Sequence, residues 1–289
     1  MLKIKTPATT ANMGAGFDAF GMAFDLFNEI TIQESDNFKI ISQDLTIPTD
    51  ESNLIYKSIK HFYSYANKPT PTIQITQTDR IPQARGLGSS AACVVGGLVA
   101  ANALAGNIAD SNQLLKLACE IEGHPDNVAP ALLGGLVTSV AEAEKVHYVK
   151  ITPPDGVTFV ALIPNFKLET KSSRGVLPAQ YSKADVTFNI ARASLFIATM
   201  ASGKWENIPT AIEDKIHQPY RKPLVPGMDE VINKAKACGA LGTYLSGAGP
   251  TVMAIVLNHR HQEFISAFKS DTWQVKTLKQ NFSGAYIEE

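Results

Sequence analysis

A glycine- and serine-rich turn leads directly into one of the most apolar segments of the chain. The turn reads Gly86-Leu87-Gly88-Ser89-Ser90, and a run with almost no polar side chains continues to Leu104. Glycines let backbone amides approach an anion closely, and the free amides of a helix's first turn add donors and a positive dipole end. Serine hydroxyls suit a phosphate oxygen or Mg²⁺. The pattern predicts either a phosphate site at the start of a buried helix or a core helix capped by serine.

Two common phosphate-binding loops do not fit this stretch. Residues 86–91 satisfy G-x-G-x-x-A, but the dinucleotide loop follows its strand directly and is followed by a second strand with an acid. Here the seven residues DRIPQAR separate the predicted strand from Gly86, and further helix follows. A Walker-type loop needs a lysine after its glycines, and none is present.

The composition limits the class of protein. The chain has 289 residues, which is long for one domain and a typical length for two. Hydrophobic residues make up 45% of the sequence, and the net charge is −1. This net charge gives no reason to expect binding to nucleic acid or to an anionic membrane. Cys93, Cys119 and Cys238 form no CxxC pair, and we interpret them as buried thiols in a reducing compartment. The N-terminus lacks the apolar core of a signal peptide, and the stretch 91–104 is too short to span a bilayer. We therefore expect a cytoplasmic protein with no membrane partner and no nucleic-acid partner.

Hydrophobic periodicity predicts strands mixed with helices, without the regular alternation of a doubly wound sheet. We expect an α+β protein. The sequence PPDG at 153–156 is the strongest boundary signal in the chain. Helices are predicted near 54–65 with Ser52 as cap, 89–105, 110–122 closed by Gly123, 185–202, 227–238 and 260–269. Strands are predicted for KIKT, ended by Pro7, and near 28–35, 70–78, 134–141, 146–151, 157–164, 242–245, 251–257, 275 and 286.

Two other glycine stretches accompany the central turn. The first, PATTANMGAGFDAFG at 7–21, surrounds its glycines with Asn12 and Asp18, and the second is LSGAGPTVMAI at 245–255. Either stretch alone is more often a structural turn. Together with PQARGLGSSAA they form three ordered motifs that resemble the GHMP kinase superfamily, whose ATP loop reads P-x-x-x-G-L-G-S-S-A.

This resemblance covers essentially the whole chain. It implies a two-domain fold, with an N-terminal domain like domain 2 of ribosomal protein S5 over 1–153 and a ferredoxin-like C-terminal domain over 154–289. It also implies ATP and Mg²⁺ as cofactors, and a possible homodimer. The implied ATP-binding residues are Pro82, Gln83, Ala84, Arg85, Gly86, Leu87, Gly88, Ser89, Ser90, Ala91 and Ala92.

The stretches PATTANMGAGFD and EGHPDNVAPALLGG resemble the homoserine kinase branch of the superfamily, although Met13 and Ala15 stand where Leu and Pro are usual. The resemblance implies phosphorylation of the L-homoserine hydroxyl in threonine biosynthesis. An α-amino acid needs an acid for its ammonium and a cation, ideally arginine, for its carboxylate. The matching residues are Asn12, Asp18, His124, Arg174 and Arg221. Without the resemblance, an isolated arginine is usually a solvated surface residue and a lone histidine a hydrogen-bonded bystander.

For the metal, the resemblance implies a loop serine, Ser90, and a glutamate at the end of the following helix pair. Glu122 fits the EG pairing and Glu120 fits the spacing of mevalonate kinases, so both stay open. The resemblance further implies that Asp126 and Asn127 are catalytic, with Asn127 orienting the hydroxyl while its proton passes to the phosphate, because no lysine accompanies the first motif. Gly247 and Gly249 are expected to pack against the ATP loop.

Two other functions stay possible at this point. A mevalonate-type kinase would act on a substrate with a carboxylate but no amine, which leaves the acid of Asp18 without a cation. A catalytically silent homologue would bind nucleotide or amino acid as a sensor. The serine loop, the acids around His124 and both arginines argue against loss of chemistry.

Overall fold

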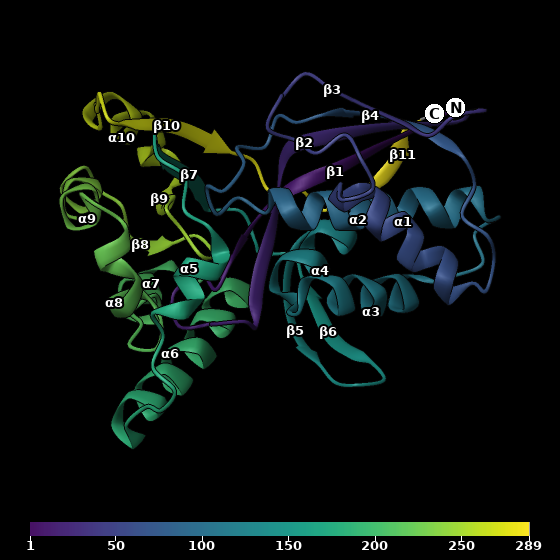
Figure 1. The fold of residues 1–289 in the computed structure, drawn as a ribbon. Helices are drawn as coiled ribbons and strands as arrows, with labels where there is room; N and C mark the ends of the chain where they lie inside the picture. Colours follow the sequence, from purple (N-terminus) through teal and green to yellow (C-terminus); the bar gives the residue numbers. More distant parts are fainter. Residues whose placement is uncertain (289) are drawn as a thin grey trace.

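The computed structural model describes residues 1–288, and their strands form two β-sheets (Figure 1). The first sheet has seven strands, and α2 and α4 pack on it while α1 and α3 pack on those helices. Its strands are β1 (Leu2–Ala11), β2 (Phe20–Glu34), β3 (Lys39–Ser42), β4 (Ile73–Thr78), β5 (Leu136–Ala141), β6 (Val146–Ile151) and β11 (Tyr286–Glu288). Its helices are α1 (Leu54–Tyr65), α2 (Ser89–Leu104), α3 (Ser111–Glu122) and α4 (Pro125–Leu133).

The second sheet has four antiparallel strands in the order β10-β7-β9-β8. They are β7 (Val157–Pro164), β8 (Gly242–Leu245), β9 (Val252–Leu257) and β10 (Trp273–Leu278). The accompanying helices are α5 (Thr170–Gly175), α6 (Lys183–Ser202), α7 (Ile208–Ala211), α8 (Gln218–Arg221), α9 (Met228–Ala237) and α10 (His261–Ala267), with short 3-10 turns η1 (Trp205–Asn207), η2 (Lys222–Leu224) and η3 (Asn258–Arg260).

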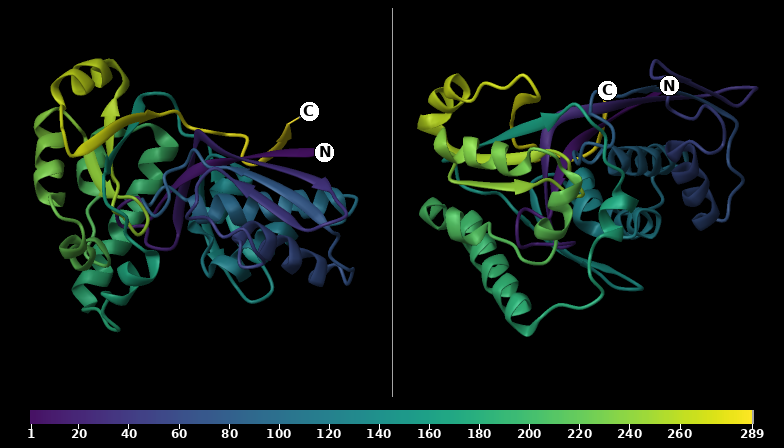
Figure 2. Two further views of the ribbon diagram at one scale, coloured as in Figure 1. Left: turned by 45° about the horizontal axis from the view of Figure 1, so that its top comes forward. Right: turned by 60° about the vertical axis from the view of Figure 1, so that its left-hand side comes forward.

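One hydrophobic cluster joins the two halves of the molecule. Phe24 of β2 lies against Phe159 of β7, with ring centroids 5.4 Å apart, and Phe20 stacks on Phe196 of α6. All four rings are almost completely buried. Figure 2 shows the two halves side by side. Because buried aromatic contacts resist displacement, the cluster fixes the relative position of any site that both halves line.

The first strand is longer than the sequence predicts. β1 continues through Pro7 to Ala11, where the sequence predicted an end at the proline. Its pairing with β2 shifts register between Pro7 and Ala8. Such an irregularity accommodates a residue that cannot donate a ladder hydrogen bond, so the proline bends the strand without ending it. The extension carries the chain to Asn12.

Two helix boundaries test the cap predictions. Asn53, rather than Ser52, caps α1, because its Oδ1 accepts hydrogen bonds from the amides of Ile55 and Tyr56. The prediction that Gly123 closes α3 is confirmed by its left-handed φ of 86°.

The segment PPDG lies between the last long strand of the first sheet and the first strand of the second, since β6 ends at Ile151 and β7 begins at Val157. The chain then returns to the first sheet, because β11 pairs with β1 beside the N-terminus (Figure 1). The domain boundary between 153 and 154 stays a prediction. Within residues 1–288, no helix has both the length and the apolar character needed to cross a membrane.

Candidate active site

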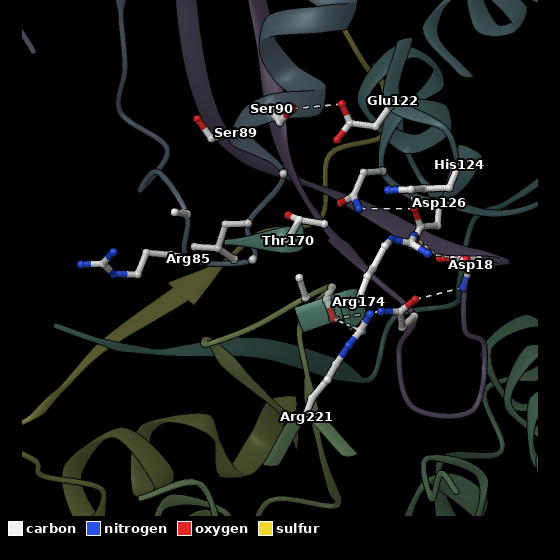
Figure 3. A pocket seen from close by; sticks show the side chains of 18 of the residues that line it. Asp18, Arg85, Ser89, Ser90, Glu122, His124, Asp126, Thr170, Arg174 and Arg221 are labelled. Atoms are coloured by element: carbon white, nitrogen blue, oxygen red, sulfur yellow. Dashed lines mark hydrogen bonds and ion pairs between the residues drawn. The ribbon is translucent and has the colours of Figure 1, made fainter. Parts of the chain in front are cut away.

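One cavity gathers most of the residues that the sequence singled out. Segments of both halves of the chain line it (Figure 3). Its lining is Asn12, Asp18, Pro82, Ala84, Arg85, Gly86, Leu87, Gly88, Ser89, Ser90, Glu122, His124, Asp126, Asn127, Thr170, Arg174, Arg221, Gly247 and Ala248. Five predicted residues do not line it: Gln83, Ala91, Ala92, Glu120 and Gly249.

The glycine-rich turn ends at the first turn of α2, as the sequence suggested. Gly88 is the N-cap, with a left-handed φ of 72° and no side-chain cap, so the alternative of a serine cap is wrong. The amide of Ala92 makes the first helical hydrogen bond, to Gly88 O at 2.9 Å. The amides before it have no acceptor within the helix and are the natural donors to an anion. The middle of α2 is buried, which confirms the predicted core helix.

Three segments hold the turn in shape. Thr9 of β1 donates its amide to Leu87 O, at 3.1 Å, and Leu168 donates to Ala84 O, at 3.0 Å. From the third glycine stretch, Ser246 Oγ donates to Gly86 O at 2.5 Å. A Cβ on Gly86 would lie 2.3 Å from the carbonyl oxygen of Ser246, so only glycine fits there. The loop therefore has one rigid conformation before any ligand binds.

Two polar side chains of the loop turn outward to support it. The guanidinium of Arg85 donates to the carbonyls of Pro164 and Asn165, at 3.0 and 2.7 Å, and thereby ties the loop to the end of β7. Figure 3 shows it directed away from the acids of the cavity. Gln83 donates to Asp44, at 3.3 Å. Ala91 and Ala92 face the core, and Gly249 lies behind Gly86.

The structure separates the two candidate glutamates. Ser90 Oγ donates to Glu122 Oε2 at 3.0 Å, whereas Glu120 pairs with His61 of α1, 2.8 Å away. Burial raises the pKa of Glu122, opposed by the charge of His124 and the Ser90 hydrogen bond. A hydroxyl and a carboxylate beside a phosphate-binding turn are the oxygen ligands that Mg²⁺ prefers. Ser90 and Glu122 fit a magnesium ion, and Glu120 is too far round the helix to join them.

The start of α4 carries a hydrogen-bonded polar chain. His124 Nδ1 lies 2.6 Å from Asp126 Oδ1, and Asn127 Nδ2 donates to the same oxygen at 3.4 Å. Thr9 Oγ1 donates to Asn127 Oδ1 at 2.8 Å, so the amide of Asn127 is held from both ends. Burial lowers the pKa of His124, but the hydrogen bond and charge of Asp126 outweigh it, so the net direction is upward.

Opposite this chain, Arg174 forms a two-bond ion pair with Asp18, at 2.7 and 3.0 Å. Asn12 holds the aspartate's segment, since its Oδ1 accepts from the amide of Asp18 and its Nδ2 donates to Gly247 O. Oxygen and nitrogen atoms of Asp18, His124 and Asp126 lie within 4.8 Å of one another. This acidic cluster is suited to an ammonium group.

Arg221 differs from Arg174 in having no acid of residues 1–288 in direct contact with its guanidinium. Its side chain is 1% exposed and donates to Ser173 O, His217 Nδ1 and Gly247 O, at 3.0 to 3.2 Å. Among the described residues it takes part in no ion pair. Burial and the nearby Arg174 lower its pKa to about 10. A buried cation with no acid in contact with it, at the wall of a cavity, is chemically suited to bind an anion.

Sequence reasoning missed several contributors. Thr170 lines the cavity, while Thr9, Phe17 and His217 support residues that do. His217 has one available signal: it precedes Arg221 by four residues, one helical turn. Thr170 and Thr9 carry none, because single threonines are common everywhere.

The sequence matches two family descriptions, "GHMP kinases N terminal domain" over residues 53–135 and "GHMP kinases C terminal" over residues 196–272. The chain belongs to the GHMP kinase family. The homoserine kinase of Clostridium beijerinckii is 42% identical, covering 100% of this chain and 96% of its own. That of Clostridium acetobutylicum is 43% identical over 99% and 100%. The crystal structure of homoserine kinase from Cytophaga hutchinsonii superposes with a TM-score of 0.90 at 31% identity, over 99% and 97% of the two chains.

These matches confirm the family and the two-domain α+β GHMP kinase fold that the three glycine motifs predicted. Membership of a kinase family makes ATP the phosphoryl donor. The chain spans nearly the full length of each of these relatives.

Proposed function

We propose that the protein transfers the γ-phosphoryl group of ATP to the hydroxyl of L-homoserine, giving O-phospho-L-homoserine for threonine biosynthesis. The observation that carries this proposal is the charge pattern beside the phosphate-binding turn. Arg221 is a buried cation with no ion-pair partner among the described residues, and the Asp18–Arg174 ion pair lies next to it. Full-length relatives that are homoserine kinases support the same substrate.

A zwitterionic amino acid matches this pattern. Its carboxylate would bind Arg221 and Arg174, and its ammonium would bind Asp18, with Asn12 and His124 beside it. Binding exchanges the Asp18–Arg174 pair for pairs with the ligand, so no charge is left without a partner. Both arginines lie near the ring of Phe17, with Cζ 5.6 and 5.2 Å from its centroid, so the two guanidinium groups are close to each other.

The triphosphate would lie over the turn 86–91, where the backbone amides before Ala92 face the cavity. Ser90 and Glu122 would hold Mg²⁺, which neutralises charge on the phosphate oxygens when it is bound. Because these two side chains already contact each other, the metal site needs little rearrangement.

The transfer step needs positioning more than proton abstraction. No lysine is among the cavity residues of the described chain, and Asp126 already accepts two hydrogen bonds. Asn127 would orient the homoserine hydroxyl, held from behind by Thr9 and Asp126. The hydroxyl oxygen attacks phosphorus in line, the bond to the ADP oxygen breaks, and the hydroxyl proton passes to the transferred phosphate.

The test is ADP release by the purified protein with ATP and Mg²⁺, with homoserine, mevalonate or galactose as acceptor. We expect release that depends on homoserine, with phosphohomoserine detected by ³¹P NMR. Faster turnover of mevalonate would replace the proposed substrate. Nucleotide binding without turnover of any acceptor would favour the silent homologue. A homodimer stays a prediction, which sedimentation velocity tests directly.

A further inference from the structure

A histidine, rather than an acid, contacts the guanidinium of Arg221. His217 immediately precedes α8, which ends at Arg221, and its side chain is completely buried. Its Nδ1 lies 3.2 Å from Arg221 Nη1, and its Nε2 lies 2.9 Å from the carbonyl oxygen of Gly14. The imidazole therefore links the glycine turn of the first motif to Arg221.

The two contacts define the protonation state of this ring. A guanidinium only donates hydrogen bonds, so His217 Nδ1 must accept one and carries no proton. A carbonyl oxygen only accepts, so the proton is on Nε2. His217 is thus a neutral imidazole in one fixed tautomer. Burial lowers the pKa of His217, which also favours the neutral form.

Neutrality matters because of what the ring contacts. A carboxylate in this place would orient Arg221 equally well but would cancel the charge that the substrate has to meet. The nearest acid, Asp214, has an oxygen 3.5 Å from His217 Nε2. Both oxygens of Asp214 already accept hydrogen bonds: from the Asn189 side chain and the Ile216 amide on one, and from the His217 and Gln218 amides on the other.

The ring itself is held from its face. His217 stacks on Phe17, with centroids 5.4 Å apart and planes at 25°, and Phe17 also lies under the guanidinium of Arg221. Neither the imidazole nor the guanidinium can rotate without breaking one of these contacts. This packing makes the direction of Arg221 a fixed property of the unliganded protein.

We propose that His217 is a positioning residue, which aims Arg221 at the substrate carboxylate without placing a negative charge in contact with the guanidinium. This proposal rests on the proposed function, in that Arg221 meets the carboxylate of the amino acid. Its consequence is specific: His217 sets the affinity for the carboxylate of the acceptor and has little effect on ATP.

Three variants of similar size separate orientation from neutralisation. His217→Asn keeps a neutral acceptor near the position of Nδ1, His217→Leu removes it, and His217→Asp adds a charge. We expect His217→Asn to keep KM for homoserine within about threefold, and His217→Leu to raise it about tenfold or more. His217→Asp should raise it further. KM for ATP should stay within about threefold in all three.

Comparing kcat/KM for two acceptors in one preparation gives a ratio that does not depend on the fraction of folded protein. Homoserinol has the amine and the hydroxyl but no carboxylate, so the ratio of kcat/KM for homoserine to that for homoserinol measures carboxylate recognition within one preparation. The ratio should fall in the leucine and aspartate variants and persist in the asparagine variant. In an Arg221→Met background, His217→Leu should lower it no further.

A wild-type ratio in the leucine variant, or an aspartate variant as good as asparagine, would overturn the proposal. Equal losses toward both acceptors would also overturn it, because they would mean a purely structural role. A ¹⁵N spectrum of the imidazole gives a readout without activity: we expect the neutral tautomer protonated at Nε2, and a proton on Nδ1 would contradict the geometry. Absence of wild-type homoserine turnover would instead refute the proposed function itself.

Discussion

Replacing Arg221 by methionine should lower activity strongly and change the free energy of unfolding only slightly. The variant keeps the length of the buried side chain and removes its charge and its donors. Stability changes through two opposing effects. A pKa lowered from 12.5 to about 10 means that the folded state disfavours the charged form, by roughly 3 kcal/mol at neutral pH. Methionine relieves that penalty in full at pH 7, well below both pKa values.

The loss of hydrogen bonds acts in the other direction. Three acceptors lose a donor, each worth about 1 kcal/mol, although Gly247 O keeps its bond from Asn12. The two effects nearly cancel, so we expect the free energy of unfolding to change by no more than about 2 kcal/mol. In a thermal melt this is a shift of a few degrees in either direction.

Activity has no such compensation. Removing one partner of a buried, hydrogen-bonded charge pair costs about 2–5 kcal/mol of binding, or roughly 30- to 4,000-fold in kcat/KM for homoserine. Steady-state kinetics with both substrates and a denaturant titration measure the two quantities on one preparation. Arg260→Met, which removes a surface pair with Glu263, is the control and should change neither. A loss of stability above about 3 kcal/mol, or a kcat/KM within threefold of wild type, would refute the reasoning.

Three further predictions concern the loop, the metal and pH. Gly86→Ala should raise KM for ATP about tenfold or more, because the added methyl group displaces the loop. Gly106 also has a left-handed φ but has open space around it, so Gly106→Ala should lose only about 1 kcal/mol of stability. Glu122→Gln should raise the Mg²⁺ concentration for half-maximal rate about tenfold, and Glu120→Gln should leave it unchanged. His124 should titrate above 6.5 in an NMR experiment, since its raised pKa means that its protonated form is favoured in the folded protein. Its stabilising contribution is complete below pH 6.5 and disappears as pH rises through the folded pKa, which denaturant titrations against His124→Asn would follow.

Each of these three predictions has an outcome that would contradict it. Normal ATP affinity in the Gly86 variant would mean that the loop adapts, and equal effects of the two glutamate variants would mean that neither holds the metal. A His124 pKa below 6.5 would show that burial outweighs the charge of its neighbour.

The sequence predicted the turn, the buried helix after it and the serine that faces the cavity, because these depend on local residue types. It left Glu120 and Glu122 unresolved for a physical reason. Two residues along a helix rotate a side chain by about 200°, so only one of the pair can face Ser90. Which one does so depends on the position of α1, whose His61 contacts Glu120, and no local pattern contains that position.

The two arginines also show that a local sequence pattern does not predict the tertiary contacts of a side chain. The sequence placed Arg174 and Arg221 together as two similar carboxylate ligands. In the structure Arg174 is paired with Asp18, whereas no acid in the described part of the chain contacts Arg221. The partners of Arg221 are Ser173 O and Gly247 O, from segments distant in the sequence, and the imidazole of His217, four residues before it. The identity of a residue could be predicted, whereas its charge environment depends on tertiary packing.

This asymmetry explains how the cavity would select a zwitterion. A ligand with only a carboxylate can bind Arg221, but drawing Arg174 away from Asp18 would leave that half-buried acid without a cation. A neutral sugar satisfies neither arginine. An amino acid supplies the carboxylate for the arginines and an ammonium for Asp18 at once, so it can open the ion pair without leaving a charge uncompensated. Specificity then comes from the ion pair between Asp18 and Arg174, which the ligand must replace with its own charges. The variant Asp18→Asn should therefore reduce the difference in kcat/KM between homoserine and acceptors that lack an amine.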